Sequence, residues 1–297
     1  MNIAKKIFVT LRGVASHPLN RAAKFKAIRD FCVAQVAVRM VPGDICVAFP
    51  NNTRLLISPR MKGSAHFISP GLCEYEEMVF VMHFLRPGDT FVDAGANVGA
   101  YTLLASGVAG ARTIAVEPSP STFGYLRQNI LLNDLLPRVS TVNAALGRGE
   151  GRLRLTEQLG TENYVCPDGE AGPSVEVPVT MLDTLLRDKQ PTLIKIDVEG
   201  FETEVLAGAA ETLARPCLQG MIIERAGNGA RYGYDEAALH RQIRDCGFMP
   251  FAYEPSSRSL SRLAAESPGN IIYLKDPGAV AERLSQASAI LFGKQKI

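Results

Sequence analysis

The segment FVDAGANVGAYT, residues 91–102, determines the fold class of this chain. It begins with the apolar pattern of a buried strand and then passes through Asp93, Asn97 and two glycines before apolar residues resume at helical spacing. Gly95 would permit a tight turn, and Gly99 would let the following helix approach closely. Because ligands bind at the carboxyl ends of parallel strands, we predict a ligand-binding loop in this segment.

Strand and helix patterns alternate on the carboxyl-terminal side of this loop. Repeated strand–helix units are typical of a parallel sheet with helices on both faces, so we predict an α/β, Rossmann-like domain over residues 74–297. Residues 148–181 interrupt the alternation with short antiparallel patterns, and the last two strands, without a helix between them, should pair antiparallel at one edge. The predicted strands are 90–95, 112–118, 138–147, 192–198, 220–226, 248–255 and 270–276, and the predicted helices are 73–85, 99–110, 121–134, 201–214 and 235–247.

The first 73 residues form an amino-terminal extension that we interpret as a cap or dimerisation element. Residues 20–40 have helical spacing, and a turn signal at residues 50–52 predicts a hairpin. We expect the basic helix to present a solvated face in packing or in a homodimer; peripheral contact with an anionic membrane or an acidic partner is the alternative. Residues 1–40 carry eight basic residues against the single acid Asp30: Lys5, Lys6, Arg12, Arg21, Lys24, Lys26, Arg29 and Arg39.

The composition is that of an ordinary globular protein. Of 297 residues, 46% are apolar and 21% charged, and the net charge of +2 gives no reason to expect a nucleic-acid partner. Six cysteines without a C-x-x-C pair are expected to be reduced thiols in a cytoplasmic protein. No apolar run approaches the roughly 20 residues of a transmembrane helix.

The first loop also indicates which ligand it binds. Ala96 follows Gly95, so the loop lacks the G-x-G-x-x-G pattern of dinucleotide sites, and the chain has no G-K-S/T of a phosphate-binding loop. The carboxylate of Asp93 would repel a pyrophosphate and attract a cation. S-adenosylmethionine (SAM), which carries an ammonium group and no phosphate, fits this charge; a simple turn or capping role is the alternative for Asp93.

Glu117 ends the next strand pattern, 24 residues after Asp93. An acid at about this distance commonly accepts hydrogen bonds from ribose hydroxyls. Pro118 and Ser119 would then turn the chain over the adenine. Asn143, at the end of the third strand pattern, could donate to the purine or act as a turn asparagine.

The segment LIKIDVEGFETEVLAGA, residues 193–209, places three charged residues in alternation on an apolar strand. Lys195, Asp197 and Glu199 share one side of an ideal strand, and the strand end would turn them toward the same cleft. A structural ion-pair cluster is one interpretation. We favour active-site residues, because the trio lies at the carboxyl end of a strand next to the predicted SAM loop.

Three segments together resemble the FkbM family of SAM-dependent methyltransferases: FVDAGANVGAYT, AVEPSPSTFGYLRQNI and KIDVEGFETEVLAGA. The resemblance spans roughly residues 74–275, and the last segment is its most specific part. It implies a seven-stranded class I methyltransferase fold and methyl transfer to a hydroxyl of a sugar, glycan or natural-product intermediate. It also implies that Tyr75 and Glu76 lie near the cofactor.

Within this interpretation Asp197 is the first candidate for the base or for orienting the acceptor, with Glu199 and Lys195 positioning it. A divalent metal bound by Asp197, Glu199 and Glu224 is a less favoured alternative. The acceptor pocket should come from loops within residues 41–73, 148–180 and 226–234. N-methyl transfer to a small molecule, a nicotinamide-dependent oxidoreductase and a non-catalytic binding protein remain as alternative functions.

Overall fold

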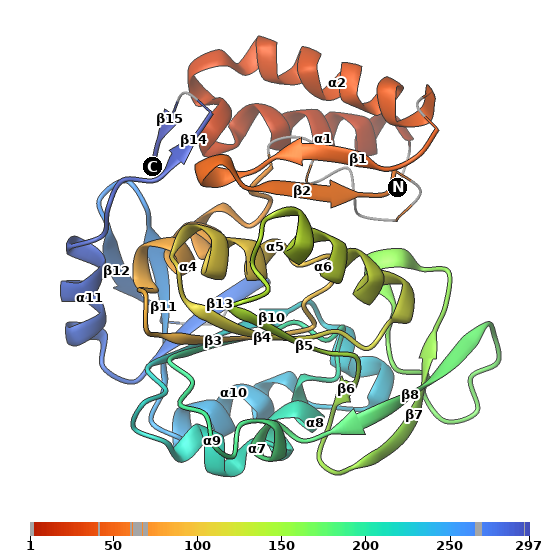
Figure 1. Ribbon diagram of the computed structural model, residues 1–297, viewed down its shortest axis with the longest axis vertical. Helices are drawn as coiled ribbons and strands as arrows, with labels where there is room; N and C mark the ends of the chain where they lie inside the picture. Colours follow the sequence, from red (N-terminus) through yellow and green to blue (C-terminus); the bar gives the residue numbers. More distant parts are fainter. Residues whose placement is uncertain are drawn as a thin grey trace.

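The computed structural model describes residues 3–40, 42–59, 61, 67, 71–264, 269–293 and 295–297. In this part of the chain, an eight-stranded sheet lies at the centre of the molecule, in the strand order β12-β11-β13-β10-β9-β3-β4-β5 (Figure 1). Its strands are β3 (Thr90–Ala94), β4 (Arg112–Val116), β5 (Val139–Val142), β9 (Leu193–Ile196), β10 (Gly220–Arg225), β11 (Met249–Glu254), β12 (Ser259–Arg262) and β13 (Gly269–Leu274).

The strand order reverses beside β3. This strand pairs in parallel with β4 on one side and with β9 on the other, and the parallel pairing extends to β5 and β10. The chain therefore winds outward from β3 to β5 and then returns to β9. Such a reversal opens a crevice at the carboxyl ends of the two central strands, and that crevice is where ligands bind in open α/β sheets.

The predicted α/β, Rossmann-like architecture is confirmed, with one strand more than the seven expected. β11 and β13 pair antiparallel, as expected, and the added strand β12 forms a hairpin with β11 at the edge. The predicted strand 138–147 is divided at Asn143. β5 stays in the central sheet, whereas β6 (Ala145–Leu146) joins a smaller sheet with β7 (Gly151–Thr156) and β8 (Ser174–Thr180).

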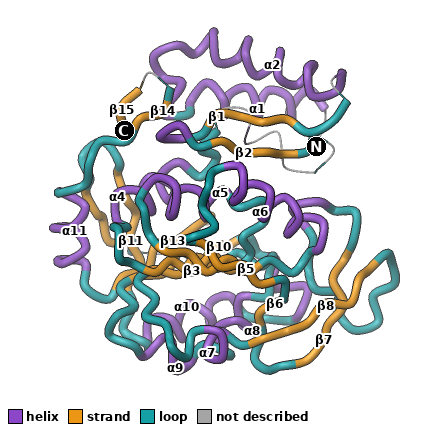
Figure 2. The backbone as a smooth tube through the Cα atoms, in the orientation of Figure 1, coloured by secondary structure: helices purple, strands orange, loops and turns teal. Residues whose placement is uncertain are grey.

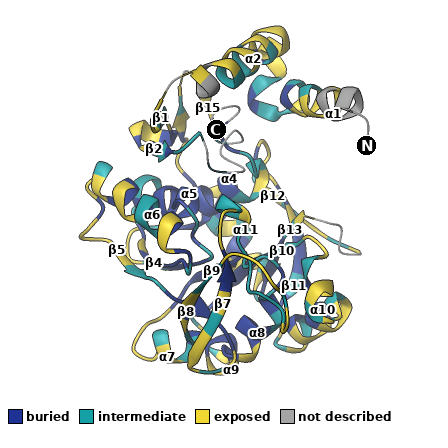
Figure 3. Ribbon diagram, turned by 90° about the vertical axis from the view of Figure 1, so that its right-hand side faces the viewer, coloured by how far each residue is buried: buried dark blue, intermediate teal, exposed yellow. Residues whose placement is uncertain are grey.

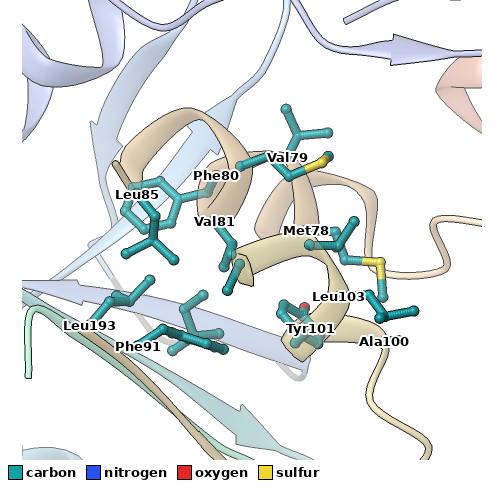
Figure 4. Close-up of a cluster of buried hydrophobic side chains, with 14 of the residues drawn as sticks. Met78, Val79, Phe80, Val81, Leu85, Phe91, Ala100, Tyr101, Leu103 and Leu193 are labelled. Atoms are coloured by element: carbon teal, nitrogen blue, oxygen red, sulfur yellow. The ribbon is translucent and has the colours of Figure 1, made fainter. Parts of the chain in front are cut away.

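Helices cover both faces of the central sheet, so the strands lie between two helical layers (Figure 2). Helix α4 has the sequence YEEMVFVMHF, and it buries seven consecutive residues because it is apolar on nearly all sides. Figure 4 shows Phe80 and Val81 of α4 above Phe91 and Leu193 of the sheet, with Met78 next to Leu103 in the same cluster. The helices of the domain are α4 (Tyr75–Phe84), α5 (Ala100–Thr102), α6 (Pro120–Leu132), α7 (Leu182–Leu185), α8 (Glu202–Ala207), α9 (Ala210–Ala214), α10 (Glu236–Asp245) and α11 (Pro277–Ser285).

The amino-terminal residues form a helical hairpin above a β-hairpin (Figure 1). The predicted β-hairpin is confirmed: β1 (Ile45–Ala48) and β2 (Arg54–Ile57) pair antiparallel. Two helices precede it, α1 (Ile3–Ser16) and α2 (Lys24–Met40), joined by a 3-10 turn at Pro18–Ala23. A last pair of short strands, β14 (Leu291–Phe292) and β15 (Gln295–Lys296), lies beside this unit. Within the described ranges, no helix is both long and apolar enough to cross a membrane.

The amino-terminal unit is fastened to the domain through α6. Asn129, a fully buried residue of α6, accepts a hydrogen bond from the backbone N–H of Leu56 and donates to the carbonyls of Leu56 and Val98. Asn133, one turn later, makes a similar pair of bonds with the backbone of Arg54. The hairpin thus packs on the domain as an added layer, and the boundary at residue 73 stays a prediction.

Candidate functional site

A cavity opens at the carboxyl ends of β3, β4 and β9, in the crevice where the strand order reverses. Its walls come from the loop after β3, the turn after β4, the segment after β9 and a strap, residues 155–165, that begins at the end of β7 and continues into the connection to β8. The lining residues are Gly95, Asn97, Glu117, Pro118, Thr122, Ala145, Leu146, Leu155, Gly160, Thr161, Asn163, Tyr164, Val165, Asp197, Val198, Glu199 and Phe201.

Gly95 brings two walls of the cavity into contact. Its φ of +82° is one that side-chain-bearing residues rarely adopt, and a Cβ there would lie 1.8 Å from the carbonyl oxygen of Asp197. Only glycine therefore allows the loop after β3 to touch the segment after β9. Gly99 has a φ of +93° and its α-carbon faces Leu126 of α6, so it serves helix packing and does not line the cavity.

Glu117 holds the turn after β4 and the first loop together. Its Oε2 accepts the backbone N–H of Asn97 and its Oε1 accepts that of Ser119, both at 2.9 Å. Each carboxylate oxygen has two lone pairs, so both keep one acceptor site for a ligand in the cavity. Burial raises the pKa of Glu117 to about 7. Asn143 donates to the carbonyls of Glu117 and Pro118, which is the turn-forming role among its two predicted roles.

Lys195 is buried behind the cavity wall and fixes Asp197. Its Nζ lies 2.5 Å from Asp197 Oδ2 and 4.6 Å from the centre of the Tyr101 ring. Burial alone would lower the pKa of Lys195, but the carboxylates of Asp197, Glu74 and Asp93 raise it above its ordinary value. Lys195 therefore stays cationic and locks the Asp197 carboxylate in one orientation.

Asp93 is also buried and does not line the cavity. Its Oδ2 accepts a hydrogen bond of 2.6 Å from the hydroxyl of Thr102, in the helix that follows the loop. Burial raises the pKa of Asp93 to about 6. Asp93 is therefore not placed to contact a bound cation directly. Its negative charge helps to keep Lys195 protonated, and its hydrogen bond to Thr102 supports the loop.

Glu199 lies in the cavity, on a sharp turn after β9. Its φ is +56°, and the turn is held by Glu202, whose Oε1 accepts the backbone N–H groups of Val198 and Gly200. Asn228 donates to Glu199 Oε2 at 3.0 Å. Burial and the charge of Asp197 raise the pKa of Glu199 to about 7.

Glu224 approaches the same charges from β10. Burial and the charges of Asp197 and Glu199 raise its pKa to about 9. It lines a second, smaller cavity beside Tyr234 and His240, apart from the main one. No group of three or more His, Cys, Asp or Glu side chains in the described residues is arranged to hold a metal ion. The alternative magnesium set of Asp197, Glu199 and Glu224 is therefore not assembled.

Two of the three predicted acceptor loops meet over the cavity. The guanidinium of Arg231 stacks 3.8 Å from the ring centre of Tyr164 in the strap, and the hydroxyl of Tyr232 donates to the carbonyl of Val165. On the opposite side, the side-chain amide of Asn97 donates to the carbonyl of Thr161. The third predicted loop, 41–73, lies partly outside the described residues.

Tyr75 and Glu76 lie away from the cavity. The Tyr75 ring meets His17 edge-on at 5.4 Å, and Glu76 is exposed. Glu74 is the residue of this segment that reaches the site, because its Oε2 accepts a 2.6 Å hydrogen bond from the Tyr101 hydroxyl beside Lys195. Glu74, Tyr101 and the wall residues Thr122, Asn163, Tyr164 and Phe201 were not among the predicted site residues. Three of them, Tyr101, Thr122 and Phe201, lie within the segments that carry the family resemblance.

Known proteins are similar to this chain in the segments that form the site. The methyltransferase FkbM domain family matches residues 93–250. Methyltransferase sdnD of Sordaria araneosa is 30% identical, over 42% of this chain and 62% of its own length. The 31-O-demethyl-FK506 methyltransferase FkbM of Streptomyces tacrolimicus is 29% identical, over 43% of this chain and 62% of its own length.

A third curated relative and a solved structure are also similar to this chain. The hexuronic acid methyltransferase AglP of Haloferax volcanii is 29% identical, over 42% of this chain and 52% of its own length. The crystal structure of methyltransferase FkbM from Methylobacillus flagellatus KT has a TM-score of 0.44 and 16% identity, covering 84% of this chain and 60% of that one. The matches thus span 52 to 62% of these three curated relatives. Since the family match covers more than half of the chain, the protein belongs to the FkbM methyltransferase family.

Proposed function

We propose that this chain transfers the methyl group of SAM to a hydroxyl oxygen of a sugar, a glycan or a natural-product intermediate. The observation that carries the proposal is one cavity with Glu117 in one wall and Asp197 and Glu199 in another. This pairing supplies acceptors for ribose hydroxyls and, next to them, carboxylates for the acceptor hydroxyl.

The residues of the cavity fit SAM. Glu117 keeps one acceptor site on each oxygen for the ribose, and the backbone at Gly95 runs where any side chain would collide with the neighbouring wall. Pro118 and Thr122 line the part of the cavity next to Glu117, where the adenine would lie. SAM supplies a methyl group that is already activated on a sulfonium, so the chain needs to align the acceptor and receive one proton.

The acceptor would bind beneath the strap and the turn at residues 228–232, which meet over the cavity. Tyr164 and Phe201 line the cavity here, and Tyr232 packs on Phe201 with ring centres 5.3 Å apart. Aromatic faces suit the C–H faces of a sugar ring. The names of two relatives, a 31-O-demethyl-FK506 methyltransferase and a hexuronic acid methyltransferase, support a hydroxylated acceptor.

Two carboxylates would have different roles toward the acceptor hydroxyl. Asp197, held by Lys195, would orient the acceptor hydroxyl through a hydrogen bond. Glu199 would take the proton, because its pKa of about 7 lets it be ionised and still basic near neutral pH. The hydroxyl oxygen then forms the bond to the methyl carbon as the carbon–sulfur bond breaks, and the proton stays on Glu199 until solvent removes it.

The test is calorimetric titration with SAM and with NAD, followed by incubation with methyl-labelled SAM and a panel of hexuronic acids, glycans and hydroxylated macrolides. We expect SAM alone to bind and the label to appear in an ether. Glu117→Gln should weaken SAM binding about 30- to 100-fold, through the loss of charge-assisted hydrogen bonds worth about 2–3 kcal/mol. Glu211 is exposed and lies outside the cavity, so Glu211→Gln serves as the control and should leave SAM binding unchanged. NAD binding without SAM binding, or label on nitrogen, would contradict the proposal.

A further inference from the structure

Positive charge is concentrated at the amino-terminal end of this chain. Residues 1–40 carry eight lysines and arginines against the single acid Asp30, whereas the rest of the chain has five more acids than bases. Asp30 is already shared between Lys26 and Arg29, at 2.6 and 2.7 Å. The amino-terminal unit therefore keeps a strong excess of positive charge, which attracts a polyanionic partner.

Helix α2 exposes an apolar stripe within this positive region. Phe25, Val33, Val36 and Met40 are 91%, 61%, 57% and 76% exposed. At about 100° per residue, the four side chains fall within roughly 80° of one another around the helix axis. Ala27, which is buried, lies on the opposite side of the helix. The outward stripe is thus apolar, and the inward face packs on the protein.

Basic side chains lie within this stripe and next to it. Lys24 and Lys26 flank Phe25 in the sequence, and Arg29 falls within the stripe, one turn after Phe25. Helix α1 has the same combination, with Phe8 at 65% and Val9 at 54% exposure next to the exposed Arg12. Both helices lie at the end of the molecule, beyond the β-hairpin and away from the central sheet (Figures 1 and 3).

We propose that α1 and α2 dock on an anionic lipid surface. Exposed Phe and Val side chains would enter the interface, while lysines and arginines contact lipid head groups. A second copy of the chain is disfavoured because two such surfaces would bring like charges together. A nucleic acid would satisfy the cations but would leave the apolar stripe exposed to water. This inference is independent of the proposed methyl transfer.

The experiment is sedimentation of the full chain with vesicles of phosphatidylcholine alone or with about 30% phosphatidylglycerol, at about 0.15 M salt. We expect binding only to the anionic vesicles and its loss at about 0.5 M salt. Phe25→Ser should weaken binding about tenfold by removing the interfacial aromatic ring. Lys24→Gln with Lys26→Gln should weaken it about 25-fold, since each cation near such a surface contributes about fivefold.

Matched control variants lie elsewhere on the surface. Leu136→Ser removes an apolar side chain that is 63% exposed, and Arg187→Gln with Lys189→Gln removes two exposed cations; both should bind like the unaltered chain. Equal binding to neutral and anionic vesicles, or unchanged binding of Phe25→Ser, would overturn the proposal. So would a dimer in light scattering that Phe25→Ser dissociates in the absence of vesicle binding, or tighter binding to polyuridine RNA than to the anionic vesicles.

Discussion

Gly95 is the residue on which the two halves of the site depend most directly. A Cβ at this position would collide with the carbonyl oxygen of Asp197, and the φ of +82° adds strain. We expect Gly95→Ala to lower the free energy of unfolding by about 2–4 kcal/mol. SAM binding, measured by calorimetry at a temperature where the variant is folded, should weaken as well.

Gly124 provides the control for this substitution. It lies within α6, and a Cβ there meets nothing within 4 Å. Gly124→Ala should stabilise the protein by about 0.5–1 kcal/mol, because alanine loses less conformational entropy in a helix. If both alanine variants unfolded at the same denaturant concentration, the close approach at Gly95 would not contribute to the free energy of unfolding.

Glu199 and Asp197 can be distinguished by their pH profiles. As a base, Glu199 must be ionised, so kcat/KM should rise with pH through about 7. Asp197→Asn removes a charge that raises the pKa of Glu199, so the rise should move to lower pH while the rate falls through lost orientation. Glu199→Gln should abolish the rise. A rise that persists in Glu199→Gln would assign the proton to another group.

Helix α6 is the element that joins the amino-terminal unit to the cofactor loop. Asn129→Ala removes three hydrogen bonds and leaves the half-buried backbone groups of Leu56 and the buried carbonyl of Val98 without this partner on α6. We expect a loss of about 3 kcal/mol in urea unfolding. Asn133→Ala removes similar bonds to Arg54, which is exposed, so water can replace them and the loss should be about 1 kcal/mol. Equal losses would contradict the effect of burial.

The elements that the sequence predicts are those with strong apolar patterns. The central strands β3, β4 and β9 bury nearly every side chain, so the sequence shows them as clear apolar runs. β12 was not predicted, since its sequence SLSR is polar and only its hairpin with β11 makes it a strand. The division of residues 138–147 into β5 and β6 could not be predicted either, because their sequences together have the pattern of one strand. The break between them depends on the hydrogen bond that Asn143 donates to Glu117.

The same distinction applies to the site. Glu117, Asp197 and Glu199 follow strands directly, and the carboxyl ends of parallel strands meet at one edge, so their convergence could be predicted. The strap could not, because a wall such as Tyr164 depends on contacts between loops far apart in sequence. Glu74 was missed because residues two apart on a helix face different directions, and the choice between Glu74 and Glu76 depends on where α4 begins.

At the scale of the whole molecule, several partly or fully buried acids lie around the two cavities. The pKa values of Glu117 and Glu199 are raised to about 7, and that of Glu224 to about 9. Between the ordinary pKa of about 4.5 and these values, the folded state binds more protons than the unfolded state, so stability falls as pH rises. Without ligand, we expect a lower unfolding temperature at about pH 8 than at about pH 5.

Glu224→Gln tests this origin of the pH dependence. Glutamine has no proton to lose, so the variant should be more stable than the unaltered chain at about pH 8, by roughly 1 kcal/mol or more, and similar to it at about pH 4.5. The carboxylates with lowered pKa, such as Glu204 beside Arg148, act below this window and do not reverse the sign. An unfolding temperature that rose from pH 5 to 8 would show that other groups dominate.

The eighth strand has a consequence for how copies of this protein behave at high concentration. A sheet that ended at β11 would leave the backbone of MPFAYE, in which Pro250, Phe251 and Tyr253 are buried, open to pairing with a strand of another molecule. β12 covers that edge and turns outward Ser259, Ser261 and Arg262, all exposed. Hydroxyl and guanidinium groups hold water at the rim and discourage a further strand from adding. Three polar residues that lie away from the cavity thus protect the sheet from edge-to-edge aggregation.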